Sequence, residues 1–258
     1  MKNNESGKKQ NWFYQIGSGF LELVFPAKRF CPACQQEESY QAGLGKNCFS
    51  KIALITPPIC VKCGRPQRLK AASQELCSQC LENKYYFSMA RAVGLYEGAL
   101  REYLAEIKYR YQPELADALG LLLVDWIKLH FEYRHFNQII PIPIHNQKLM
   151  LRGYNQAEIL ANPLAKYLGI KLKDDIMIRD KITASQNALD KEERFSNING
   201  AFKVVESAVI SGAKVLLVDD ILTTGATASE AARVLLRAGA LDVKVLTLAV
   251  GVIDSQWL

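Results

Sequence analysis

The sequence has no long hydrophobic run, only three histidines and no cysteine after residue 80. Its longest apolar candidate, residues 119–131, is broken by charged residues and falls short of the ~18 apolar residues that a membrane-spanning helix needs. The polar N-terminus lacks the apolar core and cleavage site of a signal peptide, so we expect a cytoplasmic protein. The three histidines do not form a ligand cluster, and no Ser-His-Asp arrangement is visible.

The composition is that of a globular protein whose charge is unevenly distributed. The 258 residues are 49% hydrophobic, which allows one sizeable domain with a buried core and a smaller module beside it. The net charge is +6, and residues 1–80 hold 11 Lys and Arg against 5 Asp and Glu, whereas the remainder is balanced. This basic part can face nucleic-acid phosphates, although zinc-bound thiolates would lower its charge and three of its lysines lie at residues 2–9.

All seven cysteines lie between residues 31 and 80, and six of them form C-x₂-C pairs. The pair Cys60 and Cys63 with the pair Cys77 and Cys80 has the spacing of a zinc ribbon, in which two tight turns direct four thiolates at one metal ion. An odd number of cysteines fits poorly with a disulfide framework, and no pair starts a helix after a strand, as a redox pair would. We therefore expect a structural Zn²⁺ on these four cysteines.

The remaining cysteines are Cys31, Cys34 and Cys48, and they form an incomplete set. Lys51 stands where a fourth cysteine would complete another C-x₂-C pair. Three outcomes stay open for this half of the pattern: a second metal bound weakly, ligands shared with the first site, or no metal.

Residues 215–227 read VLLVDDILTTGAT and carry the strongest functional signal. Four apolar residues predict a buried strand, Asp219 and Asp220 follow at its carboxyl end, and a turn rich in threonine precedes an alanine-rich helix. Open α/β sheets bind ligands at this edge, and a helix start with free N–H groups binds phosphate. The carboxylates repel phosphate, so they suit sugar hydroxyls or a hard cation. The segment thus predicts a phosphorylated-ribose site, the alternative being a buried strand and a capped helix without a ligand.

From about residue 88, strands alternate with helices, which predicts an α/β fold with a parallel sheet flanked by helices. We expect the second strand to leave the sheet at Pro141, and Pro163 to bend or end its helix near Asn162. The predicted strands are 89–96, 138–144, 215–218 and 243–250, and the predicted helices are 98–107, 114–136, one that starts at Asn155, and 226–238.

Two polar stretches are candidate parts of a site. The loop HNQKLMLRGYNQ at residues 145–156 contains His145 and Arg152 and no acidic residue. Such a loop after a strand should attract an anion, the alternative being a solvated basic loop. Residues 179–199 are polar and lack apolar periodicity, which is typical of a mobile active-site lid.

The order of these blocks resembles the ComF family of competence proteins: cysteine pairs, IKYR, PIPIHNQKLMLRGYNQAE and VLLVDDILTTGAT. The last block also resembles the phosphoribosyl-pyrophosphate (PRPP) signature of type I phosphoribosyltransferases. The resemblance implies a double zinc ribbon joined to a type I phosphoribosyltransferase-like domain. The expected parts are a tail and short helix at 1–25, a cysteine-rich zinc-ribbon module at 26–86 and the transferase-like domain at 87–258.

The resemblance further implies roles for single residues. Asp219 and Asp220 would hold the ribose hydroxyls, directly or through Mg²⁺, and would be the catalytic residues of a transferase. The 5′-phosphate loop would consist of Thr223, Thr224, Gly225, Ala226 and Thr227. The pyrophosphate would lie against Pro143, Ile144 and His145, with Arg152 close by. In a flexible loop at 180–194, the matching positions are Thr183, Gln186 and Arg194.

The family takes part in natural transformation. The resemblance therefore implies a DNA-uptake accessory protein that binds PRPP and handles single-stranded DNA, with a helicase-like partner and no membrane span. Two alternatives remain: an active phosphoribosyltransferase acting on an unidentified amine or base, and a PRPP-sensing regulator.

Overall fold

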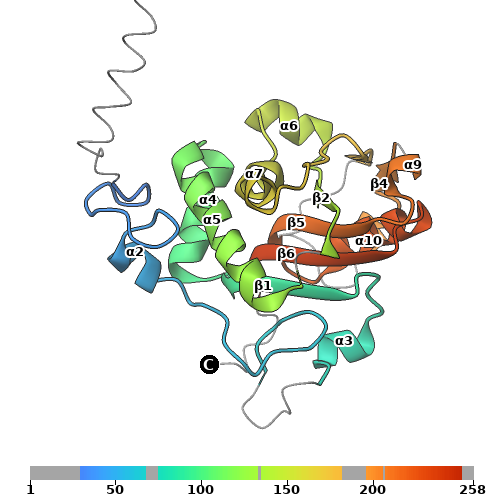
Figure 1. The fold of residues 1–258 in the computed structure, drawn as a ribbon, viewed down its shortest axis with the longest axis horizontal. Coiled ribbons are helices and arrows are strands. Elements are labelled where there is room, and N and C mark those ends of the chain that lie inside the picture. Colours follow the sequence, from blue (N-terminus) through green and yellow to red (C-terminus); the bar gives the residue numbers. More distant parts are fainter. Residues whose placement is uncertain (1–29, 68–74, 133–134, 182–195, 206, 252–258) are drawn as a thin grey trace, which may run out of the picture.

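The computed structural model describes residues 30–67, 75–132, 135–181, 196–205 and 207–251. Its central sheet has four strands, all parallel, in the order β1-β6-β5-β2 (Figure 1). The strand bounds are Met89–Leu95 for β1, Gln138–Pro141 for β2, Lys214–Leu222 for β5 and Asp242–Val250 for β6. The predicted α/β class with a parallel sheet is confirmed, and β2 ends at Pro141 as expected.

Helices cover both faces of the sheet, and alternate residues of β5 meet different helices. Leu216 and Val218 belong to the core on one face, and Val215 and Leu217 belong to the core on the other. Successive side chains of a strand point to opposite faces, so a strand covered on both sides needs a continuous apolar run. The covering helices are α4 (Gly98–Tyr109), α5 (Pro113–His130) and α7 (Gln156–Leu168) on the first face and α10 (Ala226–Arg237) on the second.

β5 is longer than its apolar run. The strand continues from Val218 through the two aspartates to Leu222. Its pairing with β6 continues too, with Asp219 opposite Thr247 and Leu222 opposite Val250. The sequence placed the acidic doublet after the strand, and this was wrong because backbone pairing, rather than side-chain polarity, decides where a strand ends. The doublet is therefore held by the sheet.

α7 continues through Pro163, so it does not end near Asn162 as one of the two expected outcomes had it. The proline ring lies against Gly120 of α5, where an added Cβ would come within 2.7 Å of Pro163 Cγ. Tight packing of α5 on α7 thus stabilises a helix that local rules would break. The missing side chain at position 120 makes this close approach possible.

Two further boundaries differ from the prediction. α5 ends at His130 rather than at residue 136, because Phe131 takes an extended conformation and packs edge-on against Phe136. The basic segment after β2 is not a loop throughout, because residues 146–152 form α6 (Asn146–Arg152). His145 caps this helix by accepting the Gln147 N–H at its Nδ1 atom, 3.2 Å away.

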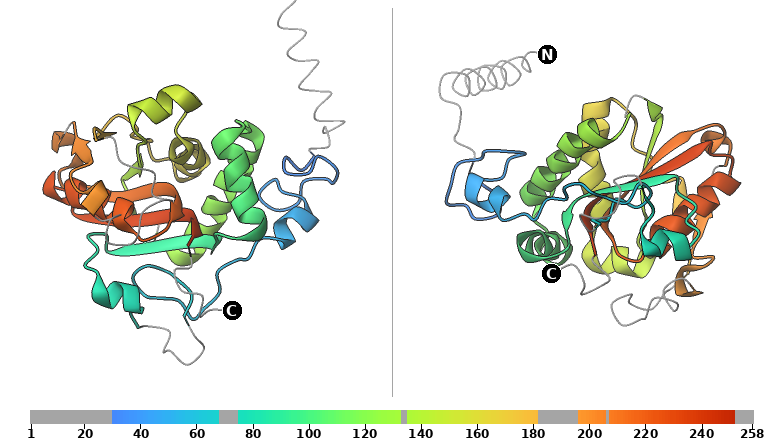
Figure 2. Two further views of the ribbon diagram at one scale, coloured as in Figure 1. Left: turned by 180° about the vertical axis from the view of Figure 1, so that it is seen from behind. Right: turned by 90° about the horizontal axis from the view of Figure 1, so that it is seen from below.

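The cysteine-rich segment contributes to both cores of the molecule. Its first part contains α2 (Lys46–Ser50) and adds Cys31, Leu44 and Cys48 to the core built on α4 and α5. Its second part contains α3 (Ser78–Glu82) and adds Cys60 and Tyr85, among others, to the core on the α10 face. Figure 2 shows α2 and α3 at well-separated places beside the sheet and its helices.

The remaining elements are short. β3 (Met177–Arg179) and β4 (Phe202–Val204) form an antiparallel pair, and α9 spans Ser207–Ile210. The expected tail and short helix at 1–25 lie outside the described residues, as does most of the expected lid, including Thr183, Gln186 and Arg194. Within the described ranges, no helix has the length and hydropathy needed to cross a membrane.

Candidate functional site

A pocket of about 310 Å³ opens where β5 and β2 end at the carboxyl edge of the sheet. This volume is at the lower end of the roughly 300–1,000 Å³ that small-molecule sites occupy. The predicted site residues that line it are Pro143, Ile144, Arg152, Asp219, Asp220, Thr223 and Thr227. The predicted residues outside the lining are His145, Thr224, Gly225 and Ala226.

The acidic side of the pocket is the doublet on β5. The backbone N–H of Asp220 donates to Asp219 Oδ1 at 2.9 Å. Burial raises the pKa of Asp219 well above its ordinary value, and the neighbouring Asp220 charge raises it further, while Arg179 acts in the opposite direction. Two carboxylates side by side in a partly closed pocket therefore favour a cation or hydroxyl donors between them.

The turn after β5 leads into α10. Gly225 adopts φ +84°, in the left-handed region that favours glycine, and α10 begins at the next residue. Thr224 Oγ1 accepts the Ala226 N–H at 3.3 Å. Thr223 and Thr227, on either side of this turn, face the pocket. The turn thus combines hydroxyl groups with the N-terminus of a 12-residue helix, which is a favourable arrangement for an anion.

Four cations also line the pocket: Lys108, Lys148, Arg152 and Arg179. Burial lowers the pKa of Lys148, and the charges of Arg179, Arg152 and Lys108 lower it further. The four cations are therefore close enough to repel one another, and a bound anion would relieve this repulsion.

Two of these cations, Lys108 and Arg179, were not predicted from the sequence as site residues. Lys108 belongs to the IKYR block, which was given no site role, and Arg179 begins the polar stretch expected to be a lid. The RGYNQ block explains how Lys108 reaches the pocket, because the Tyr154 hydroxyl donates to the Ile107 carbonyl at the end of α4. Asn155 caps α7 through Ala157 and donates to the Ile142 carbonyl beyond β2. The cap at Asn155 follows from the sequence pattern, but no spacing rule indicates the contacts to Ile107 and Ile142.

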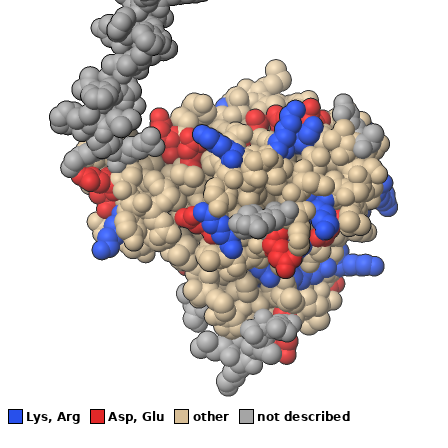
Figure 3. Space-filling model, viewed as in Figure 1, with Lys and Arg blue, Asp and Glu red and all other residues tan. Residues whose placement is uncertain are grey.

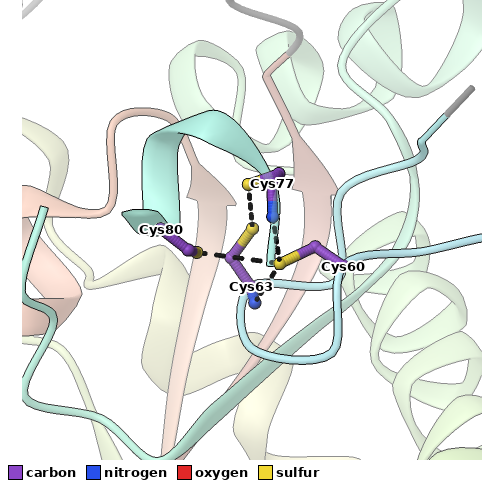
Figure 4. A group of neighbouring side chains, drawn as sticks. All are labelled: Cys60, Cys63, Cys77 and Cys80. Atoms are coloured by element: carbon purple, nitrogen blue, oxygen red, sulfur yellow. Dashed lines mark hydrogen bonds between the residues drawn. The ribbon is translucent and has the colours of Figure 1, made fainter. Parts of the chain in front are cut away.

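The four cysteines predicted as a zinc site converge on one point (Figure 4). The Sγ atoms of Cys60 and Cys80 are 3.7 Å apart, and those of Cys63 and Cys77 are 3.5 Å apart. Sulfurs around a tetrahedral zinc, with Zn–S bonds of about 2.3 Å, lie ~3.8 Å from one another. Both the donor atoms and their spacing therefore fit Zn²⁺.

A second group contains Cys31, Cys34 and Cys48 together with Glu37, and the four donor atoms lie within 4.8 Å of one another. Glu37 is the residue that the sequence did not single out. Its Oε1 lies 3.8 Å from Cys34 Sγ and accepts the Cys48 N–H at 3.1 Å. Lys51, at the position expected for cysteine, is exposed and lies outside this group. The two groups share no residue.

Comparison with known proteins adds family relationships to this geometry. A family model described as "Double zinc ribbon domain" matches residues 20–81, and one described as "Phosphoribosyl transferase domain" matches residues 155–254. The "DNA utilization protein YhgH" of Escherichia coli O6:H1 is 30% identical over 200 residues, which cover 76% of this chain and 86% of that protein.

Two relatives have competence names. "Competence protein F" of Haemophilus influenzae is 30% identical over 212 residues, covering 80% of this chain and 90% of that protein. The chain belongs to the ComF family. "Competence protein ComFC" of Bacillus subtilis is 30% identical over 202 residues, covering 75% of this chain and 78% of that protein.

ComF membership confirms the expected pairing of a double zinc ribbon with a phosphoribosyltransferase-like fold. In this ComF chain the first cysteine group has a glutamate beside its three cysteines, and the second has four cysteines.

The raised pKa of Asp219 predicts that this side chain costs stability at neutral pH. An aspartate in the unfolded chain has a pKa near 3.9. Between this pH and the higher pKa of the folded protein, the native state binds more protons than the unfolded state, so the free energy of unfolding falls as the pH rises. We expect Asp219→Asn to raise the thermal midpoint at pH 7 by about 2–4 °C, as ~1 kcal/mol does in a chain of this size. The difference should shrink as the pH falls toward 4.

The control is Asp180→Asn, because Asp180 is exposed and pairs with Lys203, which lowers the pKa of its carboxyl. This variant should gain no stability at pH 7. The measurement is differential scanning calorimetry in buffer without divalent cations. Equal midpoints for wild type and Asp219→Asn at pH 7 would show that the doublet carries no such cost.

Proposed function

We propose that this protein is a ComF-like accessory of DNA uptake whose pocket binds PRPP with Mg²⁺ and which handles single-stranded DNA. The observation that carries the PRPP proposal is that one pocket is lined by two adjacent carboxylates and by four cations. PRPP has the complementary pattern, because its ribose hydroxyls recruit carboxylates or Mg²⁺ while its phosphates require cations and N–H donors.

In this proposal Asp219 and Asp220 hold the ribose hydroxyls, directly or through Mg²⁺. The loop of Thr223, Thr224, Gly225, Ala226 and Thr227 holds the 5′-phosphate. Pro143, Ile144 and His145 lie along the pyrophosphate, and four cations balance its charge: Lys108, Lys148, Arg152 and Arg179. Support comes from the shared pocket for the lining residues, from position in the turn for Thr224, Gly225 and Ala226, and from its place next to Ile144 for His145.

The DNA part of the proposal rests on the names of the relatives and on charge. The relatives are called DNA utilization and competence proteins. Residues 1–80 carry the whole basic excess of the chain. On the face drawn in Figure 3, basic and acidic side chains alternate without one continuous basic field. We assign contact with single-stranded DNA to the cysteine-rich segment because of this excess in residues 1–80, and a helicase-like protein would be the partner during uptake.

A second candidate is an active phosphoribosyltransferase that acts on an amine or base. The complete acidic doublet and phosphate turn favour it, because displacement at C1′ of PRPP needs Mg²⁺ and cations on the leaving pyrophosphate. Release of pyrophosphate with a candidate acceptor would favour this function. Binding of PRPP with neither turnover nor DNA affinity would instead indicate a regulator that senses PRPP.

The test of the PRPP site is calorimetric titration of PRPP and Mg²⁺ into the full chain and into the double variant Asp219→Ala/Asp220→Ala. Each carboxylate contributes charge-assisted hydrogen bonds of about 1.5–3 kcal/mol, so we expect a loss of affinity of at least about 100-fold. The matched control is Asp174→Ala/Asp175→Ala, an exposed doublet away from the pocket, which should bind as wild type does. Unchanged affinity in the Asp219/Asp220 variant would contradict the site.

The DNA proposal predicts salt-dependent binding of a single-stranded oligonucleotide to the full chain. Three phosphate contacts would weaken affinity by roughly tenfold between 50 and 200 mM salt. Lys46→Gln/Lys51→Gln, which removes two exposed charges of the cysteine-rich segment, should reduce this salt dependence. Lys166→Gln/Lys171→Gln removes two exposed charges elsewhere and should leave it unchanged. Equal effects of the two variants, measured by fluorescence anisotropy, would argue against the assigned surface.

For the metals, we propose two structural zinc ions per chain. One is held by Cys60, Cys63, Cys77 and Cys80. The other is held by Cys31, Cys34 and Cys48 with the Glu37 carboxylate as the fourth ligand. A carboxylate oxygen is an ordinary zinc donor, and Glu37 reaches the thiols while backbone N–H groups of residues 47 and 48 orient it. Gly45 gives it room, since a Cβ there would lie 2.2 Å from Glu37 Cγ.

Zinc content tests the role of Glu37. Wild type should retain two zinc ions after dialysis, whereas Glu37→Gln should retain one, because an amide keeps the size and hydrogen bonds of the side chain but not its charge. Glu37→Cys should restore two by supplying a fourth thiolate, and the neighbouring exposed Glu38→Gln should keep two. Two tightly bound zinc ions in Glu37→Gln, measured by atomic emission, would exclude Glu37 as a ligand.

A further inference from the structure

The turn of residues 223–227, called the phosphate turn below, is held from outside the pocket by two residues of the cysteine-rich segment. Arg65 donates from Nε to the Gly251 carbonyl at 3.3 Å and from Nη2 to the Thr223 carbonyl. Tyr85 donates from its hydroxyl to the Thr224 carbonyl at 2.7 Å. Both side chains are buried, with exposed fractions of 6% and 3%.

These contacts fix the direction of the N–H groups in the turn. In a trans peptide the C=O of one residue and the N–H of the next point in opposite directions. Arg65 holds the Thr223 carbonyl, so the Thr224 N–H points away from it. Tyr85 holds the Thr224 carbonyl in the same way, so the Gly225 N–H points away from the ring. The two N–H groups are thereby oriented away from the cysteine-rich segment.

The Tyr85 ring also limits how the turn can move. A Cβ on Gly225 would come within 2.8 Å of Tyr85 Cε1, so backbone and ring are in direct contact. The next residue of the cysteine-rich segment, Tyr86, donates its N–H to Ser229 Oγ on α10 at 3.1 Å. The segment therefore supports both the turn and the first part of the helix that follows.

The metal group in turn positions Arg65. Arg65 follows Cys63 by two residues, and its carbonyl accepts the Cys60 N–H at 2.8 Å. A buried guanidinium needs a compensating charge, and within the described ranges no carboxylate forms an ion pair with Arg65. Four thiolates and one Zn²⁺ carry a net charge of −2, and Arg65 lies close enough to the Cys63 thiol to interact with it electrostatically.

We propose that Arg65 and Tyr85 are positioning residues for the phosphate turn, and that metal at Cys60, Cys63, Cys77 and Cys80 keeps them in place. Occupancy of this zinc site is thereby coupled to the order of the turn across the boundary between ribbon and sheet. The consequence for ligand affinity rests on the proposed PRPP function, whereas the consequence for the turn itself does not.

Hydrogen exchange tests the proposal on the full chain with zinc bound. Arg65→Met should retain its zinc and show amide exchange in residues 222–228 that is about 10- to 100-fold faster, the range expected for losing a charged hydrogen bond. Arg91→Met is the matched control, because Arg91 also lies beside the thiolates but donates to the carbonyls of Ala90 and Val61 instead of the turn. The control should exchange as wild type does.

Removal of zinc tests separately whether the metal keeps Arg65 and Tyr85 in place. Removing zinc from wild type with a chelator should accelerate exchange in residues 222–228 while residues 113–130 of α5 stay protected. The same treatment of Arg65→Met should accelerate exchange in these residues little further, because the contact of Arg65 with the Thr223 carbonyl is already lost. If zinc-free wild type keeps a protected turn, the coupling to the metal is refuted.

If Arg65→Met does not fold, Tyr85→Phe decides the question, because it removes only one hydroxyl. It should accelerate exchange in the turn by roughly fivefold or more, whereas Tyr103→Phe, which loses a hydroxyl contact to Cys48 instead, should not. Exchange in Arg65→Met or Tyr85→Phe that equals the controls overturns the proposal. Faster exchange in these variants, together with a wild type that binds no PRPP, would leave the positioning role intact and refute the PRPP function alone.

Discussion

The parallel pairing of β5 between β6 and β2 is the constraint on which the rest of the site depends. This pairing continues past the apolar residues, so Asp219 and Asp220 are fixed by backbone hydrogen bonds even though polar side chains disfavour a buried strand. Thr223 follows the strand into the pocket, and α10 begins three residues later. A shift of one residue in its register would turn each of these side chains to the opposite face.

The second feature that organises the site is a pocket lined by both carboxylates and cations. Carboxylates stand on the strand, and four cations come from three other parts of the chain: the end of α4, α6 and β3. Gathering like charges costs stability, both between the two carboxylates and among the four cations. Such a cost is typical of sites that bind a ligand of complementary charge, since the ligand offsets the repulsion.

The cysteine-rich segment shows how a small metal-binding region can be part of a larger fold. Each of its metal groups adds cysteines to one of the two cores beside the sheet. The metal groups therefore define the local turns, and the larger domain supplies most of the buried surface. Through Arg65 and Tyr85 the segment also contacts the turn that begins α10.

The sequence by itself determined the parallel α/β fold, the strand that carries the acidic doublet, and the four-cysteine group. These features depend on local spacing: an apolar run, a C-x₂-C pair, a glycine before a helix. Only the tertiary structure decided the roles of Lys108, Arg179 and Glu37, the continuation of α7 through Pro163 and the length of β5. Each of these depends on a partner distant in sequence, such as Gly120 beside Pro163 or β6 beside β5. Short-range patterns record what a residue prefers, and packing between distant segments determines which preference prevails.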